Sequence, residues 1–353
     1  MSGVCEKGEP VKLAWAAVAH PDHPYGYGVI NKRLSLALSQ AGATILPGRA
    51  FGWDAVVAVA LPLAWLAGPD VIFHTMYECR PLPPDWAAVL NRCGAVWVPS
   101  QFCYDLFREA GVSVPMFVSG YGIDPEIFRP SARPSASVRG GGPMRFLVWG
   151  RGMVSRKNVL LAARAFLAAA LPPYEAVLEI KVNDHFASEG MIFKDAQGKA
   201  IPNIHVVAGD WTDTQMANWL GSGDCMIYLS AGEGYGLMPL EAMATGMPLI
   251  CAYNTGMMTY LTPENALLVP TVGQEVSQNY TQRFGVESTW CKPDFEAAVN
   301  HIRWVFENRE AAYAIGRRAA ADAAKLTWEA AGRRALVEIQ AHYGRPEHGH
   351  AGG

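Results

Sequence analysis

The sequence has no block of like charge, because its 29 basic and 32 acidic side chains are interspersed and leave a net charge of −3. A nucleic-acid surface or a polybasic membrane patch is therefore not indicated. A long apolar run is also missing: the longest, Ala55 to Gly68, is broken by Pro62 and falls short of the roughly 20 residues of a membrane span. Met1 to Pro10 has no apolar export signal. We expect a cytoplasmic protein without a transmembrane segment, and peripheral membrane contact is left open.

Paired cysteines are absent as well. The seven cysteines are an odd number, show no CxxC spacing and mostly lie in apolar segments. This pattern is typical of free thiols in a reducing compartment and not of a disulfide or zinc framework. No strand-like run is followed by a full Gly-x-Gly-x-x-Gly fingerprint, which disfavours a plain NAD-binding Rossmann enzyme.

The length of 353 residues, half of them apolar, allows two globular domains. Strand-like apolar runs alternate with helical patterns, which predicts α/β domains with parallel sheets covered on both faces. A segment rich in Pro, Ser and Gly then interrupts the pattern and predicts a linker. The expected division is a first α/β domain at 1–130, a linker at 131–143, a second α/β domain at 144–310, closing helices at 311–343, and a disordered tail at 344–353.

The stretch from Ser230 to Pro248 combines glycines with two glutamates. Apolar runs at 225–229 and 249–252 predict buried strands on either side of it, with one helix between them. Glu233 then lies in a glycine-rich loop and Glu241 in the first helical turn. Because ligands of an open parallel sheet bind beyond the carboxyl ends of its strands, both carboxylates are expected beside one anion-binding crevice. A carboxylate would repel phosphate, so we expect both to accept hydrogen bonds from sugar hydroxyls.

A cluster of positive charge lies between a predicted strand at 145–149 and a helix that Asn158 is expected to cap. The loop contains Arg151, Arg156 and Lys157. Cations beside a helix N-terminus are unfavourable unless an anion lies between them, so this loop is a candidate phosphate site. A solvated cluster of charges is the alternative for the loop taken alone.

The first βα unit has a strand at 12–19 followed by Gly26 and Gly28. A glycine pair lets the backbone approach a ligand closely, although ordinary tight turning explains such a pair about as well. His74 directly follows a strand at 71–73, at the sheet edge where ligands bind. Its role is left open between a buried structural histidine and a ligand-binding one.

Taken together, these motifs resemble glycosyltransferase family 4. The strongest match is Glu233 with seven intervening residues before Glu241, and the next is a Gly-Arg pair ending at Arg151 with Lys157 six positions later. The resemblance implies the GT-B fold, with two Rossmann-like parallel-sheet domains that face each other across a cleft. It also implies a C-terminal helix that packs back toward the N-terminal domain.

The resemblance assigns the charged residues to a sugar donor. Arg151 and Lys157 would neutralise the donor diphosphate and stabilise the charge that grows on it as the glycosidic bond breaks. Glu241 would accept hydrogen bonds from the ribose hydroxyls. Glu233 would bind hydroxyls of the transferred sugar.

The same resemblance assigns further contacts. The amides of Gly236 and Leu237 would hold the sugar or the adjacent phosphate, and His74 would contact the sugar near the reacting carbon. Gly26 and Gly28 would allow the first domain to close over the phosphates. Gly26-Tyr-Gly28 departs from the adjacent glycines of the family, which weakens that assignment.

The activity implied is that of a retaining hexosyltransferase (EC 2.4) that uses a UDP-, GDP- or ADP-sugar as co-substrate and a hydroxyl acceptor of unknown identity. No cofactor and no metal are expected, because two cations and a helix dipole take the role of a divalent ion. The Asp-x-Asp motif of many metal-dependent glycosyltransferases is also missing. A front-face substitution, in which the leaving phosphate helps to deprotonate the acceptor, suits these residues.

Three alternatives remain: a GT-B sugar phosphorylase, a nucleotide-sugar epimerase, and a sugar-nucleotide-binding protein without turnover. The segment from Gly273 to Lys292 is polar and is expected to be irregular, as in an acceptor-specific insertion.

Overall fold

The structure is a computed structural model that describes residues 10–17, 26–47, 53–130, 142–150, 156–183, 193–194 and 197–343. The chain divides into two compact units. Unit 1 consists of Met1–Tyr77, Leu82–Gly122 and Trp328–Gly353, and unit 2 of Glu78–Pro81 and Ile123–Thr327. The four residues Glu78–Pro81 therefore belong to unit 2, although the chain on both sides of them belongs to unit 1.

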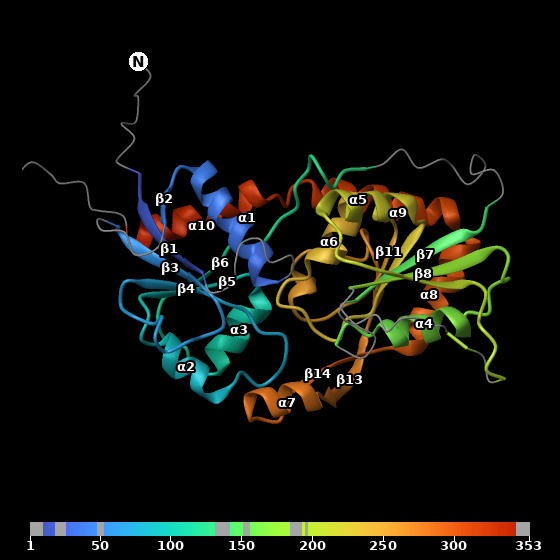
Figure 1. Cartoon of the computed structure of the whole chain (residues 1–353), viewed down its shortest axis with the longest axis horizontal. Coiled ribbons are helices and arrows are strands. Elements are labelled where there is room, and N and C mark those ends of the chain that lie inside the picture. The colour runs from blue at the N-terminus through green and yellow to red at the C-terminus, as the bar shows by residue number, and fades with distance from the viewer. Residues whose placement is uncertain are drawn as a thin grey trace, which may run out of the picture. The chain divides into compact units, whose positions relative to one another are not determined.

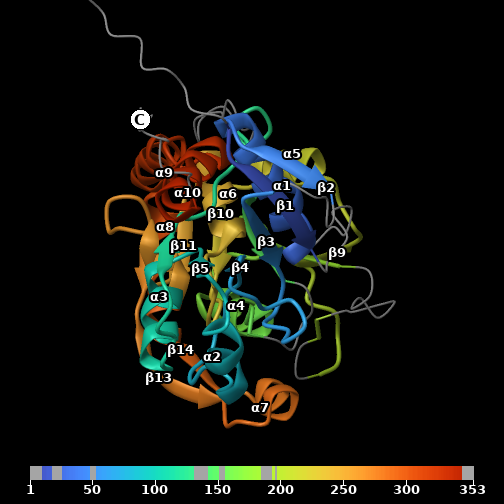
Figure 2. The same ribbon diagram turned by 90° about the vertical axis from the view of Figure 1, so that its left-hand side faces the viewer.

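Unit 1 is built on a six-stranded parallel sheet (Figure 1). Its strands, in sheet order, are β2 (Thr44–Pro47), β1 (Lys12–Ala17), β3 (Ala55–Val59), β4 (Val71–His74), β5 (Ala95–Val98) and β6 (Met116–Val118). Its helices are α1 (Tyr27–Ala41), α2 (Pro84–Leu90), α3 (Gln101–Glu109) and α10 (Trp328–Tyr343). Helices α1 and α10 lie against one face of the sheet, and α2 and α3 against the other (Figures 1 and 2).

The central strands of unit 1 explain why its sheet is parallel and covered. Every residue of β4 and β5 is buried, as in sheets with helices on both faces. Helix α3 begins at Gln101, because the Ser100 hydroxyl accepts a hydrogen bond from the Cys103 N–H at 3.2 Å. The strand β2 was not predicted from the sequence.

Helix α10 packs against α1, so the C-terminal helix returns to the N-terminal domain as expected. The helices approach closely at Gly332, where a Cβ atom would lie 2.6 Å from the carbonyl oxygen of Ala37. Helix α9 (Arg309–Ala323) instead belongs to unit 2. Among the described residues, none of the helices is both long and apolar enough to cross a membrane.

Unit 2 contains a second six-stranded parallel sheet, with the order β12 (Leu267–Val269), β11 (Leu249–Ala252), β10 (Cys225–Tyr228), β7 (Met144–Trp149), β8 (Ala176–Val182) and β9 (Ile204–Ala208). Helices α4 (Val159–Ala168) and α8 (Phe295–Glu307) lie on one face. Helices α5 (Asp213–Ser222), α6 (Leu237–Ala244) and α9 lie on the other (Figure 1). A short 3-10 helix, η2 (Thr255–Thr259), follows β11.

The segment expected to be irregular is ordered secondary structure, so that prediction was wrong. It forms the antiparallel strands β13 (Thr271–Val276) and β14 (Thr289–Pro293), with α7 (Gln278–Phe284) between them. The Ser277 hydroxyl accepts the Tyr280 N–H at 3.3 Å, and Gly285 ends the helix in the left-handed conformation. The sequence did not reveal these strands for two reasons. Their composition is polar, and each pairs with a strand on the far side of α7.

Candidate functional site

The candidate site lies at the carboxyl ends of adjacent parallel strands in unit 2. Strand β10 pairs with β7 on one side and β11 on the other. The described residues between these three strands and α4, α6 and η2 meet at one edge of the sheet. This is the edge at which open α/β sheets bind ligands.

Glu233 is the centre of the hydrogen-bond network at this edge. Its Oε1 atom accepts hydrogen bonds from Lys157 Nζ at 2.5 Å, Tyr228 Oη at 2.7 Å and Ser230 Oγ at 2.7 Å. Its Oε2 atom pairs with an Arg156 guanidinium nitrogen at 2.9 Å. Burial by itself would raise the pKa of Glu233, but Arg156 and Lys157 hold it well below its usual range. The carboxylate is therefore ionised, and its Oε1 atom holds three of its four contacts.

Lys157 is a desolvated cation. Its Nζ atom also donates to Tyr228 Oη at 2.8 Å and lies 5.1 Å from the centre of the Trp149 ring. Burial lowers the pKa of Lys157 to about 8, although Glu233 opposes that shift. Burial and the charge of Glu233 raise the pKa of Tyr228, so the phenol stays protonated and donates a hydrogen bond to Glu233.

Arg156 was not among the predicted site residues, yet it joins two carboxylates. One guanidinium nitrogen pairs with Glu233 and also donates to the Gly232 carbonyl, and the other pairs with Glu78 Oε1 at 3.0 Å. The Tyr280 hydroxyl donates to Glu78 Oε2 at 3.3 Å. The only sequence signal for Arg156 was its place among three cations in one loop.

The residues that follow Glu78 are held by backbone hydrogen bonds to β14. Arg80 N–H donates to the Thr289 carbonyl at 3.0 Å, and Thr289 N–H donates to the Arg80 carbonyl at 2.7 Å. The segment that follows His74 in sequence is thus held on β14 and on Arg156. This explains why Glu78–Pro81 belongs to unit 2.

Helix α6 begins at the same edge. Gly236 is its N-cap with φ of 92°, and its carbonyl accepts a hydrogen bond from Tyr260 Oη at 2.5 Å. Leu237 is the first helical residue, and Glu241 is half-buried one turn later. Neither α6 nor α4 has a side-chain N-cap bond or an acidic residue in its first turn. Both N-termini are therefore suited to an anion.

We expect Gly236→Ala to destabilise the protein by about 1–3 kcal/mol, because a left-handed residue with a Cβ atom is strained. The new Cβ would also lie 2.7 Å from Met257 Cγ and 2.8 Å from Tyr260 Oη. Urea unfolding measures the loss. Gly285→Ala is the matched control, since its φ is 67° but nothing lies within 4 Å of the added atom. Equal losses in the two variants would contradict the proposed close contact at Gly236.

A family model described as "Family 4 Glycosyltransferase in conflict systems" matches residues 105–334, which is more than half of the 353 residues. The chain belongs to glycosyltransferase family 4. It is a transferase enzyme, and its two parallel sheets form the GT-B fold.

Known proteins agree with this assignment. The glycosyltransferase is 27% identical over 139 residues to D-inositol 3-phosphate glycosyltransferase from Paenarthrobacter aurescens (strain TC1), a match that covers 38% of this chain and 34% of that relative. The match thus spans about a third of the relative's length.

Two solved structures share the fold across most of this glycosyltransferase. Sucrose-phosphate synthase from Thermosynechococcus elongatus superposes with a TM-score of 0.67 at 16% identity and covers 94% of this chain and 98% of its own. The Anabaena protein Alr3699/HepE superposes with a TM-score of 0.63 at 13% identity and covers 94% and 99%.

Unit 1 of the glycosyltransferase brings together the predicted residues Gly26, Gly28 and His74 at its own sheet edge. Gly26 is the N-cap of α1 and Gly28 is buried in the first turn. The Tyr27 hydroxyl between them lies 3.1 Å from the hydroxyl of Thr75, the residue after His74. These three predicted residues lie in unit 1, whereas Lys157 and Glu233 lie in unit 2.

His74 is fully buried, and its Nε2 atom lies 2.8 Å from Tyr121 Oη. Burial lowers the pKa of His74 to about 3, against a hydrogen bond to the Trp97 backbone that raises it. The imidazole is therefore neutral near pH 7 and packs against the ring of Trp97 at 4.6 Å. Arg151, the other predicted cation, lies outside the described residues.

The described cysteines of the glycosyltransferase are free thiols, and all of them except Cys291 are buried. Burial raises the pKa of Cys79 to about 12, so that thiol is a poor nucleophile. In the part of the chain that the structure describes, His, Cys, Asp and Glu side chains form no group of three that could hold a metal ion.

Proposed function

We propose that this glycosyltransferase transfers a sugar from a nucleoside-diphosphate sugar to a hydroxyl acceptor, with retention of anomeric configuration and without a metal ion. The observation that supports this most is the buried Lys157–Glu233 cluster beside the N-termini of α4 and α6. A buried cation and two helix N-termini without side-chain caps form a setting for a diphosphate. Lys157 and Arg151 would then take the role of a divalent ion.

The donor nucleotide is the next part of the proposal. The Anabaena protein was solved in complex with UDP and glucose, which supports a UDP-sugar donor here, with GDP and ADP as alternatives. Glu241 would bind the ribose hydroxyls from its half-buried position on α6. The amides of Gly236 and Leu237 would bind the sugar or its phosphate.

The network around Glu233 argues against a covalent sugar intermediate on this carboxylate. Its Oε1 already accepts three hydrogen bonds, and an acid with so low a pKa is a weak nucleophile and base. We therefore propose a front-face substitution. The bond from the anomeric carbon to the donor oxygen breaks, the acceptor oxygen attacks from the same side, and the leaving phosphate takes the acceptor proton. The Oε2 atom of Glu233, which also pairs with Arg156, would accept a hydrogen bond from a sugar hydroxyl.

Two further residues would support the transfer. His74 is assigned to the sugar near the reacting carbon, and as a neutral imidazole it would act as a hydrogen-bonding group and not as an acid. Arg156 is a positioning residue, because it contacts Glu233 and Glu78 and sets the direction of the Glu233 carboxylate. Gly26 and Gly28 are assigned to the phosphates at the start of α1.

An assay of the full chain with UDP-, GDP- and ADP-sugars tests the function. Release of one nucleoside diphosphate with formation of an α-linked product from an α-linked donor is expected, and it should persist after treatment with EDTA. Donor binding should also raise Tm, because a ligand stabilises the state that binds it. A rise in Tm without turnover on any acceptor would favour the non-catalytic alternative. Formation of a sugar phosphate from inorganic phosphate would favour a phosphorylase, and an isomerised donor would favour an epimerase.

The lowered pKa of Lys157 predicts a loss of donor use at alkaline pH. Its ordinary pKa is 10.5, but in this buried site the ammonium deprotonates near pH 8. Since kcat/KM reports ionisations of the free enzyme, kcat/KM for the donor is expected to fall as the pH rises through about 8. Rate measurements between pH 6 and 10 would detect this alkaline limb.

Lys157→Arg provides the control, because a guanidinium keeps its charge throughout the pH range of about 6 to 10. The residual activity of that variant should show no limb near pH 8. The same limb in both proteins would assign the ionisation to another group.

A further inference from the structure

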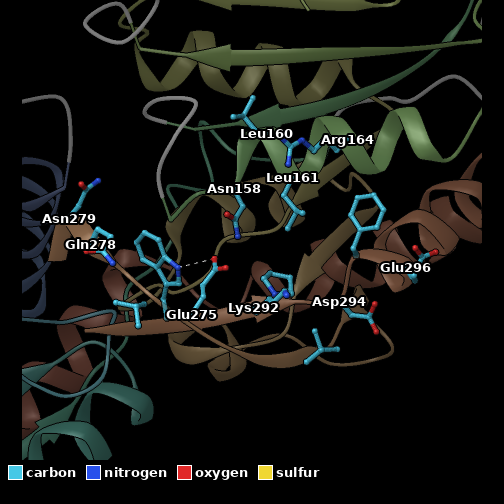
Figure 3. Close-up of a pocket in the computed structure, with 15 residues that line it drawn as sticks. Asn158, Leu160, Leu161, Arg164, Glu275, Gln278, Asn279, Lys292, Asp294 and Glu296 are labelled. Carbon is cyan, nitrogen blue, oxygen red and sulfur yellow. Dashed lines mark hydrogen bonds between the residues drawn. The ribbon is translucent and has the colours of Figure 1, made fainter. Parts of the chain in front are cut away.

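A groove of about 680 Å³ lies in unit 2 between the first turns of α4 and the β13–β14 hairpin (Figure 3). This volume is within the range of roughly 300–1,000 Å³ that is typical of small-molecule sites. In Figure 3, Asn158 and Leu161 point from α4 toward Glu275 and Lys292 on the hairpin. Of the residues assigned above to the donor, none of those that the structure describes lines this groove.

The strand β14 lines the groove and is also hydrogen-bonded to the donor loop, which is the loop at 230–236 that carries Glu233. Trp290 and Lys292 are alternate residues of β14, so their side chains lie on one face, and both line the groove. Cys291 lies between them, and its N–H donates to the Ala231 carbonyl at 2.8 Å, two residues before Glu233. A ligand in the groove would therefore contact the hairpin that supports the donor loop.

Trp290 is held as a rigid aromatic surface. Its Nε1–H donates to Glu275 Oε1 at 3.0 Å, and its ring meets Tyr280 edge-on at 6.1 Å. Apolar side chains extend the wall beside it, and two of them are strongly exposed: Val272 is 57% and Val276 is 43% exposed. An exposed apolar wall around an aromatic ring is the usual mark of a binding surface.

The charges of the groove select against an anion. Among the described residues that line it, carboxylates outnumber cations: Glu275, Asp294 and Glu296 are acidic, and Arg164 and Lys292 are basic. Two of these carboxylates already accept hydrogen bonds within the protein. Glu275 accepts one from the Trp290 side-chain N–H, and Asp294 accepts one from the Ala297 backbone N–H at the start of α8. A phosphate or a nucleic-acid backbone would therefore gain little here.

We propose that this groove is a second ligand site that binds a neutral carbohydrate. A sugar ring has an apolar C–H face, which suits Trp290 and the valines, and a rim of hydroxyls. The amides of Gln278 and Asn279 at one end of the groove supply both donors and acceptors for such hydroxyls. The site goes beyond the proposed transfer reaction and would hold a part of a glycan that does not react.

Isothermal titration of the full chain with maltotriose, cellotriose, chitotriose and mannotriose tests this site. At least one of them is expected to bind with Kd of about 1 mM or tighter. Trp290→Ala and Val272→Asp should each weaken that binding by at least about tenfold, as expected for the loss of aromatic contact or the burial of a charge. Trp290→Phe should retain most of the affinity, because it keeps an aromatic face.

Val337→Asp is the matched control for Val272→Asp, because Val337 is 64% exposed on α10 in unit 1. It should bind the sugar as the unmodified chain does. Binding should also persist in saturating UDP. The proposal is overturned if none of the four sugars binds, if Trp290→Ala and Val272→Asp bind normally, or if UDP displaces the sugar. The UDP-dependent rise in Tm is measured separately, and its absence would count against the proposed function but not against the groove.

Discussion

Lys157→Met is expected to lower kcat/KM for the sugar donor by about 100-fold or more, as the loss of other preorganised charges does. The methionine keeps much of the side-chain volume but removes the ammonium that would face the diphosphate. Because negative charge grows on the diphosphate as the glycosidic bond breaks, most of the loss should appear in kcat. Initial rates at varied donor concentration separate kcat from KM, and Tm shows whether the variant is folded.

The matched control for this variant is Lys325→Met. Lys325 is 71% exposed and pairs with Asp322 at 2.9 Å on the surface, so its loss should leave the rate within about twofold. A Lys157→Met enzyme that is folded and retains more than a third of its kcat/KM would remove Lys157 from the diphosphate site. A loss confined to KM would assign Lys157 to ground-state binding alone.

Arg156→Met is expected to destabilise the fold by about 3–5 kcal/mol, because removing one member of a buried ion pair leaves charge without compensation. Two carboxylates depend on this guanidinium, Glu78 at 3.0 Å and Glu233 at 2.9 Å. The side chains of Arg156 and Glu233 are only 16% and 7% exposed, so water does little to replace the contact. Urea unfolding measures the destabilisation.

The control is Arg318→Met, which breaks a surface pair with Asp322 whose arginine is 61% exposed and should cost about 0–1 kcal/mol. If Arg156→Met does not fold, Arg156→Lys serves instead, since it keeps the charge but not the two-pronged contact. In a folded Arg156→Lys enzyme, a positioning role predicts a lower kcat with little change in donor KM. Unchanged stability and kcat in both Arg156 variants would contradict this role.

The Arg156–Glu78 pair can also be isolated by a double-mutant cycle. Glu78→Gln removes one charge, and in the double variant with Arg156→Lys the two losses should not add. A coupling of at least about 0.5 kcal/mol is expected for residues in contact. Additive losses would mean that Glu78 and Arg156 act independently.

Most strands and helices could be predicted because their signals are local. The runs at 95–98 and 225–228 are buried throughout, and parallel sheets produce such continuous apolar strands. Ser100 marks the start of α3 because its cap bond spans only three residues. Lys157 and Glu233 could be placed at one sheet edge, because the carboxyl ends of neighbouring parallel strands meet there.

Other contacts could not be predicted because they join distant segments. Tyr280 and Glu78 are 202 residues apart in sequence, and no local propensity relates them. The β13–β14 hairpin was missed for a different reason. Every residue of β13 is exposed, so the strand has no buried face and no alternation of apolar and polar residues to reveal it. Arg156 could be recognised as a cation in a loop, but its two acidic partners depend on tertiary packing.

The sequence by itself determined that Glu233 and Lys157 lie at one edge of a parallel sheet, because each follows a predicted strand closely and the carboxyl ends of parallel strands meet at one edge. Only the tertiary structure decided which side chains contact the Glu233 carboxylate. Four donors from separate positions converge on its carboxylate, and their charges hold its pKa low while burial lowers that of Lys157. The physical reason is that desolvation and ion pairing depend on distances between side chains, and folding sets those distances.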